Sequence, residues 1–278
     1  MTRVPFSPHR VGLIAWNTLL EASRQKLFHF LLLLALGFVA GAWTLRDFNF
    51  GAPELKFLED FGFGAMAFFG AALTIAAMAQ LFFSEIENRT ALTLLAKPVW
   101  RAEFILGKYL GVVAVIAVFC VLVTALLAAV LVWRETGLRR EMGEAFPKEG
   151  AVDYAKLAAA GALQYLKLAV LAAFTLLVAS FAQTQLYTTV AGCAVLVICH
   201  LQYLAQEVYA HAGSVAARLV GGAIGLLFPN FQLFNLVNEL SAGAALPWER
   251  VARVSLYAGG YIAATVVLGA YSFRQREI

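Results

Sequence analysis

Charge is scarce in this sequence. Only 14% of the 278 residues are Asp, Glu, Lys or Arg, whereas 62% are hydrophobic and the mean hydropathy is +0.77. Soluble domains average about 25% charged residues, so this composition excludes an ordinary water-soluble protein and predicts an integral membrane protein in contact with the lipid bilayer. The net charge of +4 is not gathered into a basic patch with interleaved aromatic residues. We therefore expect no nucleic acid partner.

Cysteine is also rare. The three cysteines, Cys120, Cys193 and Cys199, all lie in apolar stretches and lack C-x-x-C spacing. We interpret them as small buried hydrophobic residues, not as disulfide partners or metal ligands. His200 adjoins Cys199, but neighbouring residues on a helix point in different directions, and no second His or carboxylate follows one turn later. The sequence therefore predicts that this chain binds no metal and no cofactor.

Three further absences concern energy and chemistry. The sequence has no G-x-x-x-x-G-K-[ST] pattern, because Gly107-Lys108 is followed by Tyr109, and this excludes ATP binding through a P-loop. We expect no ionisable residue near the middle of any membrane span, which argues against coupling to protons or sodium. No nucleophile, histidine and carboxylate converge as an intramembrane enzyme would require, so we expect a noncatalytic chain. A separate nucleotide-binding subunit would then supply energy.

Long apolar runs are abundant. A helix needs about 20 apolar residues to cross the hydrocarbon core of a membrane, and six stretches satisfy this length. The fold is therefore predicted to be all-α and polytopic, with six transmembrane helices. The expected spans cover residues 27–45, 61–83, 104–133, 163–182, 186–206 and 254–273.

Three other segments complete the expected topology. Residues 10–25 alternate apolar and polar side chains, which predicts an N-terminal amphipathic elbow helix in the membrane interface. A short glycine-rich stretch that stops at Pro229-Asn230 predicts an outer re-entrant region over about residues 218–239. A short span that reverses the last helix is the alternative. The charged insert over about residues 134–158 predicts an outer loop, which would be an external cap, a partner-binding surface or a solvated linker.

The distribution of Lys and Arg sets the expected orientation. Basic residues precede the first span, surround the second loop and follow the last span, which predicts that both termini are cytoplasmic. The outer insert is also basic, but its Lys and Arg residues alternate with Asp and Glu. We keep the orientation because the early helices dominate this rule.

One polar segment is organised. In residues 85–97, Glu85, Arg89, Thr93 and Lys97 recur every four residues, so on a helix they form one polar stripe. Pro98 disfavours helical geometry at the preceding residue and should end the helix there. Such an amphipathic element lies along a surface and does not cross the membrane. Without further information, it is equally an interfacial anchor for the loop.

Four matches in the correct order resemble one family. Residues 85–111 contain E-I-E-N-R-T, L-L-A-K-P-V and E-F-I-L-G-K-Y-L-G after the second span. The N-terminal A-W-N-T-L-L-E-A-S-R-Q-K-L-F, the later P-N-F-Q-L-F-N and the closing F-R-Q-R-E-I also fit. Over nearly its whole length, the chain resembles a permease subunit of the type-2 ATP-binding cassette (ABC) exporters, in the six-helix group related to multicopper-enzyme maturation permeases.

The resemblance implies a single transmembrane permease domain over residues 1–278, in a bacterial or archaeal inner (plasma) membrane. It would move an unidentified substrate with a second permease copy or a paralogue. A cytoplasmic ABC ATPase would bind ATP and Mg. A membrane scaffold that relays ATPase motion without transporting a substrate is the alternative. Residues 85–97 would be the cytoplasmic coupling helix, and the ATPase-coupling residues would be Glu85, Glu87, Asn88, Arg89, Thr90 and Lys97.

Overall fold

The computed structural model describes residues 6–44, 53–87, 100–143, 152–211, 215–235 and 248–275. Within these ranges, all regular secondary structure is helical, and six helices are long and apolar enough to cross a membrane. The predicted all-α polytopic fold with six spans is thus confirmed. The spans are α2 (Lys26–Gly41), α3 (Glu54–Glu87), α5 (Arg101–Met142), α6 (Tyr154–Phe181), α7 (Gln185–His211) and α10 (Trp248–Arg274).

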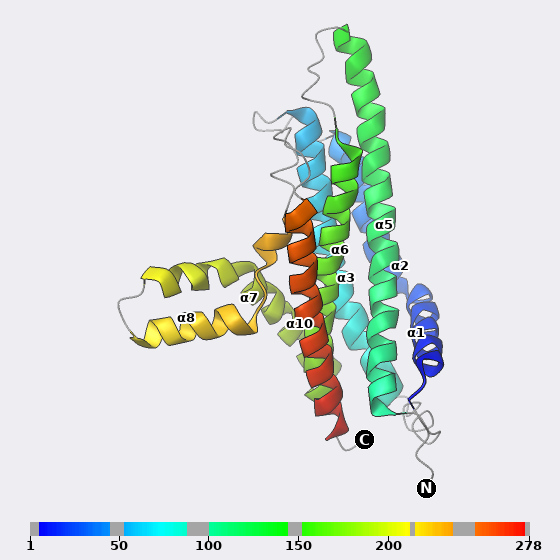
Figure 1. Cartoon of the computed structure of the whole chain (residues 1–278). Helices are drawn as coiled ribbons and strands as arrows, with labels where there is room; N and C mark the ends of the chain where they lie inside the picture. Colours follow the sequence, from blue (N-terminus) through cyan, green and yellow to red (C-terminus); the bar gives the residue numbers. More distant parts are fainter. Residues whose placement is uncertain are drawn as a thin grey trace.

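Helices α3, α5 and α6 form the centre of the bundle. Helix α6 packs against α3, α5, α7 and α10, while α2 packs on α3 and α5 (Figure 1). Buried apolar side chains such as Met66, Phe119 and Leu171 fill the space between the central helices. Large apolar side chains stay exposed on α2, α7 and α10, as expected for surfaces that face lipid.

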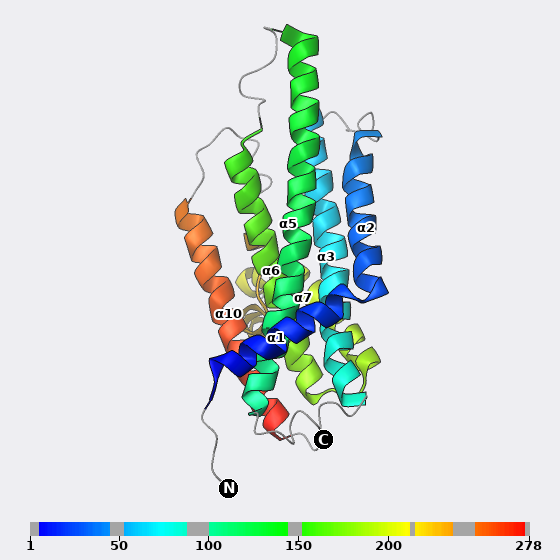
Figure 2. The ribbon, with the colours of Figure 1, turned by 90° about the vertical axis from the view of Figure 1, so that its right-hand side faces the viewer.

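Helix α1 (Pro8–Ser23) lies obliquely across α5 near the end of the bundle at which α10 terminates (Figure 2). Two glycines one turn apart on α5 allow this close approach. A Cβ atom at Gly107 would lie 2.6 Å from the Cβ of Ile14, and one at Gly111 would lie 2.8 Å from the carbonyl oxygen of Ala15. The small-xxx-small pattern G-K-Y-L-G therefore forms the seat for α1.

Helix α5 is longer than the sequence prediction. Residues 134–142, which were expected in the outer loop, continue α5, so the helix has 42 residues. Ionic contacts hold this extension. Arg134 forms a bidentate ion pair with Glu54 of α3, and Glu135 accepts hydrogen bonds from Arg139 and Tyr154. The hydropathy of the sequence predicts that the span ends where charged residues begin. In the structure, the helix continues because these charged residues form ion pairs.

Helix α6 also differs from the sequence prediction, and its true start overturns an expectation about ionisable residues in the spans. It begins at Tyr154, well before the expected residue 163, because the Asp153 side chain accepts hydrogen bonds from the backbone N–H groups of Ala155 and Lys156 and caps the helix. Lys167 is therefore residue 14 of 28 in this helix. The expectation that no ionisable residue lies near the middle of a span was wrong, since the late start had placed Lys167 near an end.

The segment after α7 leaves the bundle and returns. Helix α8 (Val215–Leu227) has 13 residues, about 20 Å of helix, which is too short to cross a membrane. It projects sideways together with part of α7 (Figure 1). The chain then returns as a short 3-10 helix, η4 (Phe231–Phe234), which packs on α6 and α7. Asn230 fixes this return, because its side chain accepts from the Gln232 N–H and its own N–H donates to the Tyr257 hydroxyl.

Candidate functional site

The expected coupling residues lie at the edge of the described structure. Glu85 and Glu87 are in the last turn of α3, where only the backbone is described. The other four, Asn88, Arg89, Thr90 and Lys97, lie outside the described residues, so their role stays a prediction. The structure does describe the two helix ends that this segment joins, the end of α3 and the start of α5.

Glu103 joins the start of α5 to the start of α1. Its carboxylate is fully buried and accepts hydrogen bonds from the Arg10 guanidinium at 2.6 and 3.0 Å. It also accepts from the backbone N–H of Ser7 at 2.7 Å and of Trp100 at 3.0 Å. The last contact caps the N-terminus of α5. Hydrogen bonding to Glu103 raises the pKa of Arg10, so the guanidinium stays charged at physiological pH.

Glu21 makes a second connection among three helices. One carboxylate oxygen lies 3.7 Å from the Nζ atom of Lys108, an ion-pair distance beyond hydrogen-bond length, and Lys108 is only 1% exposed. The other oxygen accepts a hydrogen bond of 2.9 Å from the Ser84 hydroxyl. The end of α1 is thereby attached to both α5 and the last turns of α3.

Arg101 brings the end of α10 to the same place. Its Nη1 atom donates to the carbonyl oxygens of Phe273 at 3.2 Å and of Arg274 at 2.8 Å, which are among the terminal carbonyls that a helix leaves without intrahelical partners. Just inside the bundle, the rings of Phe82, Phe104 and Phe273 lie 5.6–6.1 Å apart between centroids. Polar and aromatic contacts therefore hold the ends of α3, α5 and α10 together.

These contacts define what we call the helix-end junction. It ties four helices together at the point where the 88–99 segment leaves α3 and enters α5. Its polar members are Arg10, Glu21, Ser84, Arg101, Glu103 and Lys108.

The sequence contains a signal for the junction in addition to its amphipathic and family patterns. In the sequence, Glu103 belongs to a family pattern and Lys108 to that pattern and to the incomplete P-loop sequence, while Arg10 and Glu21 lie in the predicted amphipathic helix over residues 10–25. The G-K-Y-L-G motif indicates that another helix approaches α5 closely, and Lys108 sits inside it. A charged residue inside a helix-packing motif predicts a charged partner on the approaching helix.

The described ranges contain no group of three or more His, Cys, Asp or Glu residues that could hold a metal ion. All three cysteines are free thiols. Cys120 and Cys199 are buried as expected, but Cys193 is exposed, so the expectation that all three are buried was wrong for Cys193.

Comparison with known protein families identifies a family for this chain. The model of a family described as ABC-2 family transporter protein matches residues 13–278, which is nearly the whole chain. The match covers α3, α5 and α10 in full and all of α1 except its first turn, where Arg10 lies. No curated protein matches the sequence.

Proposed function

The chain belongs to the ABC-2 family of transporter proteins, and on that premise we propose that it is the membrane-spanning permease subunit of an ABC exporter. A separate cytoplasmic ATPase, with its own ATP and Mg, supplies the energy. Two permease halves, either copies or paralogues, form the transport path in a bacterial or archaeal inner membrane, with both termini cytoplasmic. The permease itself carries out no chemistry.

The helix-end junction is the observation that carries this proposal. The segment expected to contact the ATPase, residues 85–97, connects α3 directly to α5. Ser84 and Arg101 stand on either side of the 88–99 segment, and both are hydrogen-bonded within the junction. A force applied to the segment therefore reaches α3 and α5 first, and α1 and α10 through the Arg10–Glu103 and Arg101 contacts.

The packing of the bundle favours transmission over local absorption of that force. Glu103 is completely buried with its hydrogen bonds satisfied, and the neighbouring aromatic rings leave little room for one helix end to move alone. Closure of the ATPase would then tilt the connected helices together. Tilting the four connected helices against the rest of the bundle is a rigid-body rearrangement of the kind that opens and closes transport paths.

The test is recovery of an ABC ATPase with the permease. Full-length chain is extracted in mild detergent and purified, and co-purifying proteins are quantified by mass spectrometry. The wild type is compared with Glu85→Lys and Arg89→Glu. Arg253→Glu is the matched control, because Arg253 lies near the opposite end of the bundle in an exposed i, i+4 pair with Glu249.

We expect the wild type and the control to recover equal amounts of one ABC ATPase, and each reversal at Glu85 or Arg89 to reduce recovery at least about tenfold, as for a charged contact at a protein interface. Size-exclusion profiles establish that the variants remain folded. If no ABC ATPase is recovered with the wild type, or if both reversals retain it fully, the coupling assignment is wrong. Uptake into vesicles then separates export from relay of motion without transport.

A further inference from the structure

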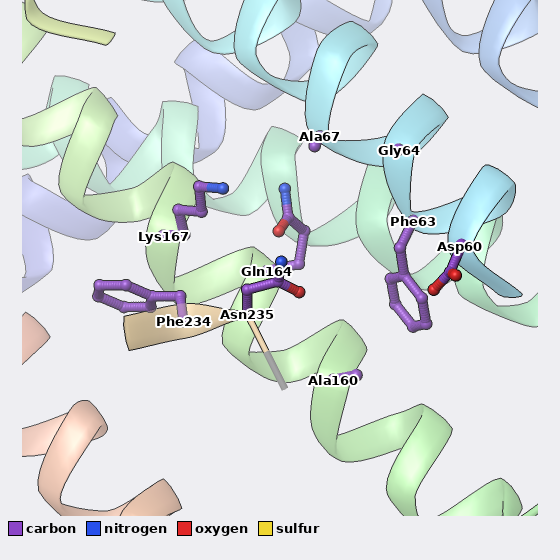
Figure 3. A pocket seen from close by; sticks show the side chains of 9 residues that line it. All are labelled: Asp60, Phe63, Gly64, Ala67, Ala160, Gln164, Lys167, Phe234 and Asn235. Carbon is purple, nitrogen blue, oxygen red and sulfur yellow. The ribbon is translucent and has the colours of Figure 1, made fainter. Parts of the chain in front are cut away.

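A polar cavity lies between α3, α6 and η4, away from the helix-end junction. Its volume is about 280 Å³. Lys167 and Gln164 of α6 and Asp60 of α3 line it, together with the amide side chain of Asn235 (Figure 3). Phe63 and Phe234 supply apolar walls. The cavity therefore combines few polar groups with aromatic surface, as small-molecule sites usually do.

Two buried polar groups point into this cavity. Lys167 and Gln164 lie three residues apart on one face of α6, and each is only 9% exposed. The Nε2 atom of Gln164 has no hydrogen-bond partner among the described residues. The Nζ atom of Lys167 lies 5.5 Å from the centroid of the Phe231 ring, and within the described ranges no carboxylate lies within ion-pair distance of it.

Burying the Lys167 ammonium and the Gln164 amide without polar partners costs free energy unless another group accepts their hydrogen bonds. Buried polar groups in proteins are nearly always hydrogen-bonded, and buried charges are nearly always paired. An aromatic ring compensates only a small part of the hydration that an ammonium group loses. The missing partner of Lys167 and Gln164 is a group that accepts hydrogen bonds and carries negative charge.

The side of the cavity that faces Lys167 carries a negatively charged residue. Figure 3 shows Lys167 and Asp60 on opposite sides, with Gln164 between them. Asp60 is exposed, so the cavity reaches the surface on that side. Its carboxylate repels a second negative charge and attracts a positive one. A ligand with an anionic end and a cationic end would match both sides.

We propose that this cavity binds a small zwitterion. The anionic group, a carboxylate or a phosphate, contacts the Lys167 ammonium and the Gln164 amide, and an ammonium group of the ligand faces Asp60. The ligand is either a free amino acid-like molecule or the headgroup of phosphatidylethanolamine. The proposal concerns binding alone and holds whether or not the chain exports its ligand.

The first arm of the test uses three small-molecule probes that share a four-carbon chain. The thermal unfolding midpoint of the purified full chain is followed against the concentration of 4-aminobutanoate, butanoate and butylamine. Binding to the folded state raises the midpoint. We expect 4-aminobutanoate to raise it at the lowest concentration if the ligand is a free molecule. The second arm compares nanodiscs of phosphatidylethanolamine with nanodiscs of phosphatidylglycerol, and a higher midpoint only in the former identifies the lipid headgroup.

Variants assign the two charges. Lys167→Met should weaken binding about ten- to hundredfold, the cost of losing a charged hydrogen bond. Asp60→Asn should remove the preference for 4-aminobutanoate over butanoate. Lys156→Met is the control, because Lys156 is also buried on α6 but pairs with Asp153 and does not line the cavity. Equal binding by Lys167→Met and wild type, a rise in the midpoint with butanoate equal to that with 4-aminobutanoate, or no response in either arm would overturn the proposal.

Discussion

The helix-end junction and the cavity around Lys167 both place charged residues inside an apolar bundle, but the two regions differ in the partners that these residues have. In the junction, Glu103 faces the Arg10 guanidinium and Lys108 faces Glu21. In the cavity, the described partner of Lys167 is an aromatic ring, and the Gln164 amide nitrogen has none. Oppositely charged pairs hold helices in place, whereas a buried ammonium without a carboxylate nearby leaves capacity for a ligand. The same residue types therefore serve as attachment in one region and recognition in the other.

The largest effect should come from removing the centre of the junction. Glu103→Ala leaves Arg10 and two backbone N–H groups without their acceptor, and breaking a buried ion pair from one side costs about 3–5 kcal/mol. We expect unfolding in detergent, measured with denaturant, to lose about 3 kcal/mol because Arg10 can partly rehydrate. Glu249→Ala removes an exposed pair with Arg253 and should cost less than about 0.5 kcal/mol. Equal losses would mean that the junction is not a structural anchor.

An intermediate effect is expected where α1 seats on α5. Gly111→Ala places a methyl group 2.5 Å from the Cβ of Thr18 and 2.8 Å from a backbone oxygen of α1, and such overpacking costs about 1–3 kcal/mol. Gly259→Ala in α10 meets nothing within 4 Å and should be neutral or stabilising by up to about 1 kcal/mol. The readout is the unfolding midpoint together with the rate at which protease cleaves near α1. A destabilised Gly259→Ala would show that helical glycines matter here for another reason.

The smallest expected change in stability is an increase, opposite in sign to the two losses above. Lys167→Met keeps an unbranched side chain one atom shorter and removes a buried ammonium that lacks a carboxylate partner in the described residues, so stability without ligand should stay equal or rise by about 1 kcal/mol. Denaturant unfolding of the ligand-free protein measures it. A loss comparable to that of Glu103→Ala would place Lys167 among the structural charges and remove the contrast between the two regions.

Sequence alone predicted the parts of the fold that depend on average hydropathy. Each of the six spans was located because a run of apolar residues must lie in lipid whatever its neighbours are. The helix ends were less accurate, since they depend on individual partners. Arg134 extends α5 by pairing with Glu54, and Asp153 starts α6 early by capping it. Neither contact leaves a signature in hydropathy.

The sites were harder to predict for a related reason. The junction joins Arg10 to Glu103 across 93 positions, and only the packing of α1 on α5 brings them together. The resemblance of residues 85–111 to a family pattern includes Glu103 and Lys108, but it gave no reason to assign them a contact with α1. Lys167 was overlooked because its importance comes from its depth in α6, which an error of nine residues in the helix start concealed.

The length of α5 has a mechanical consequence. Its 42 residues span about 63 Å, roughly twice the hydrocarbon thickness of a membrane, and its first turn is part of the junction. A rod of that length works as a lever, so a tilt of about 10° at the base sweeps the far tip through roughly 11 Å. A displacement of a few ångströms beside Glu103 is thus magnified at Arg139 and Arg140. A pair of spin labels at that tip would convert small movements at the base into distances that are readily measured.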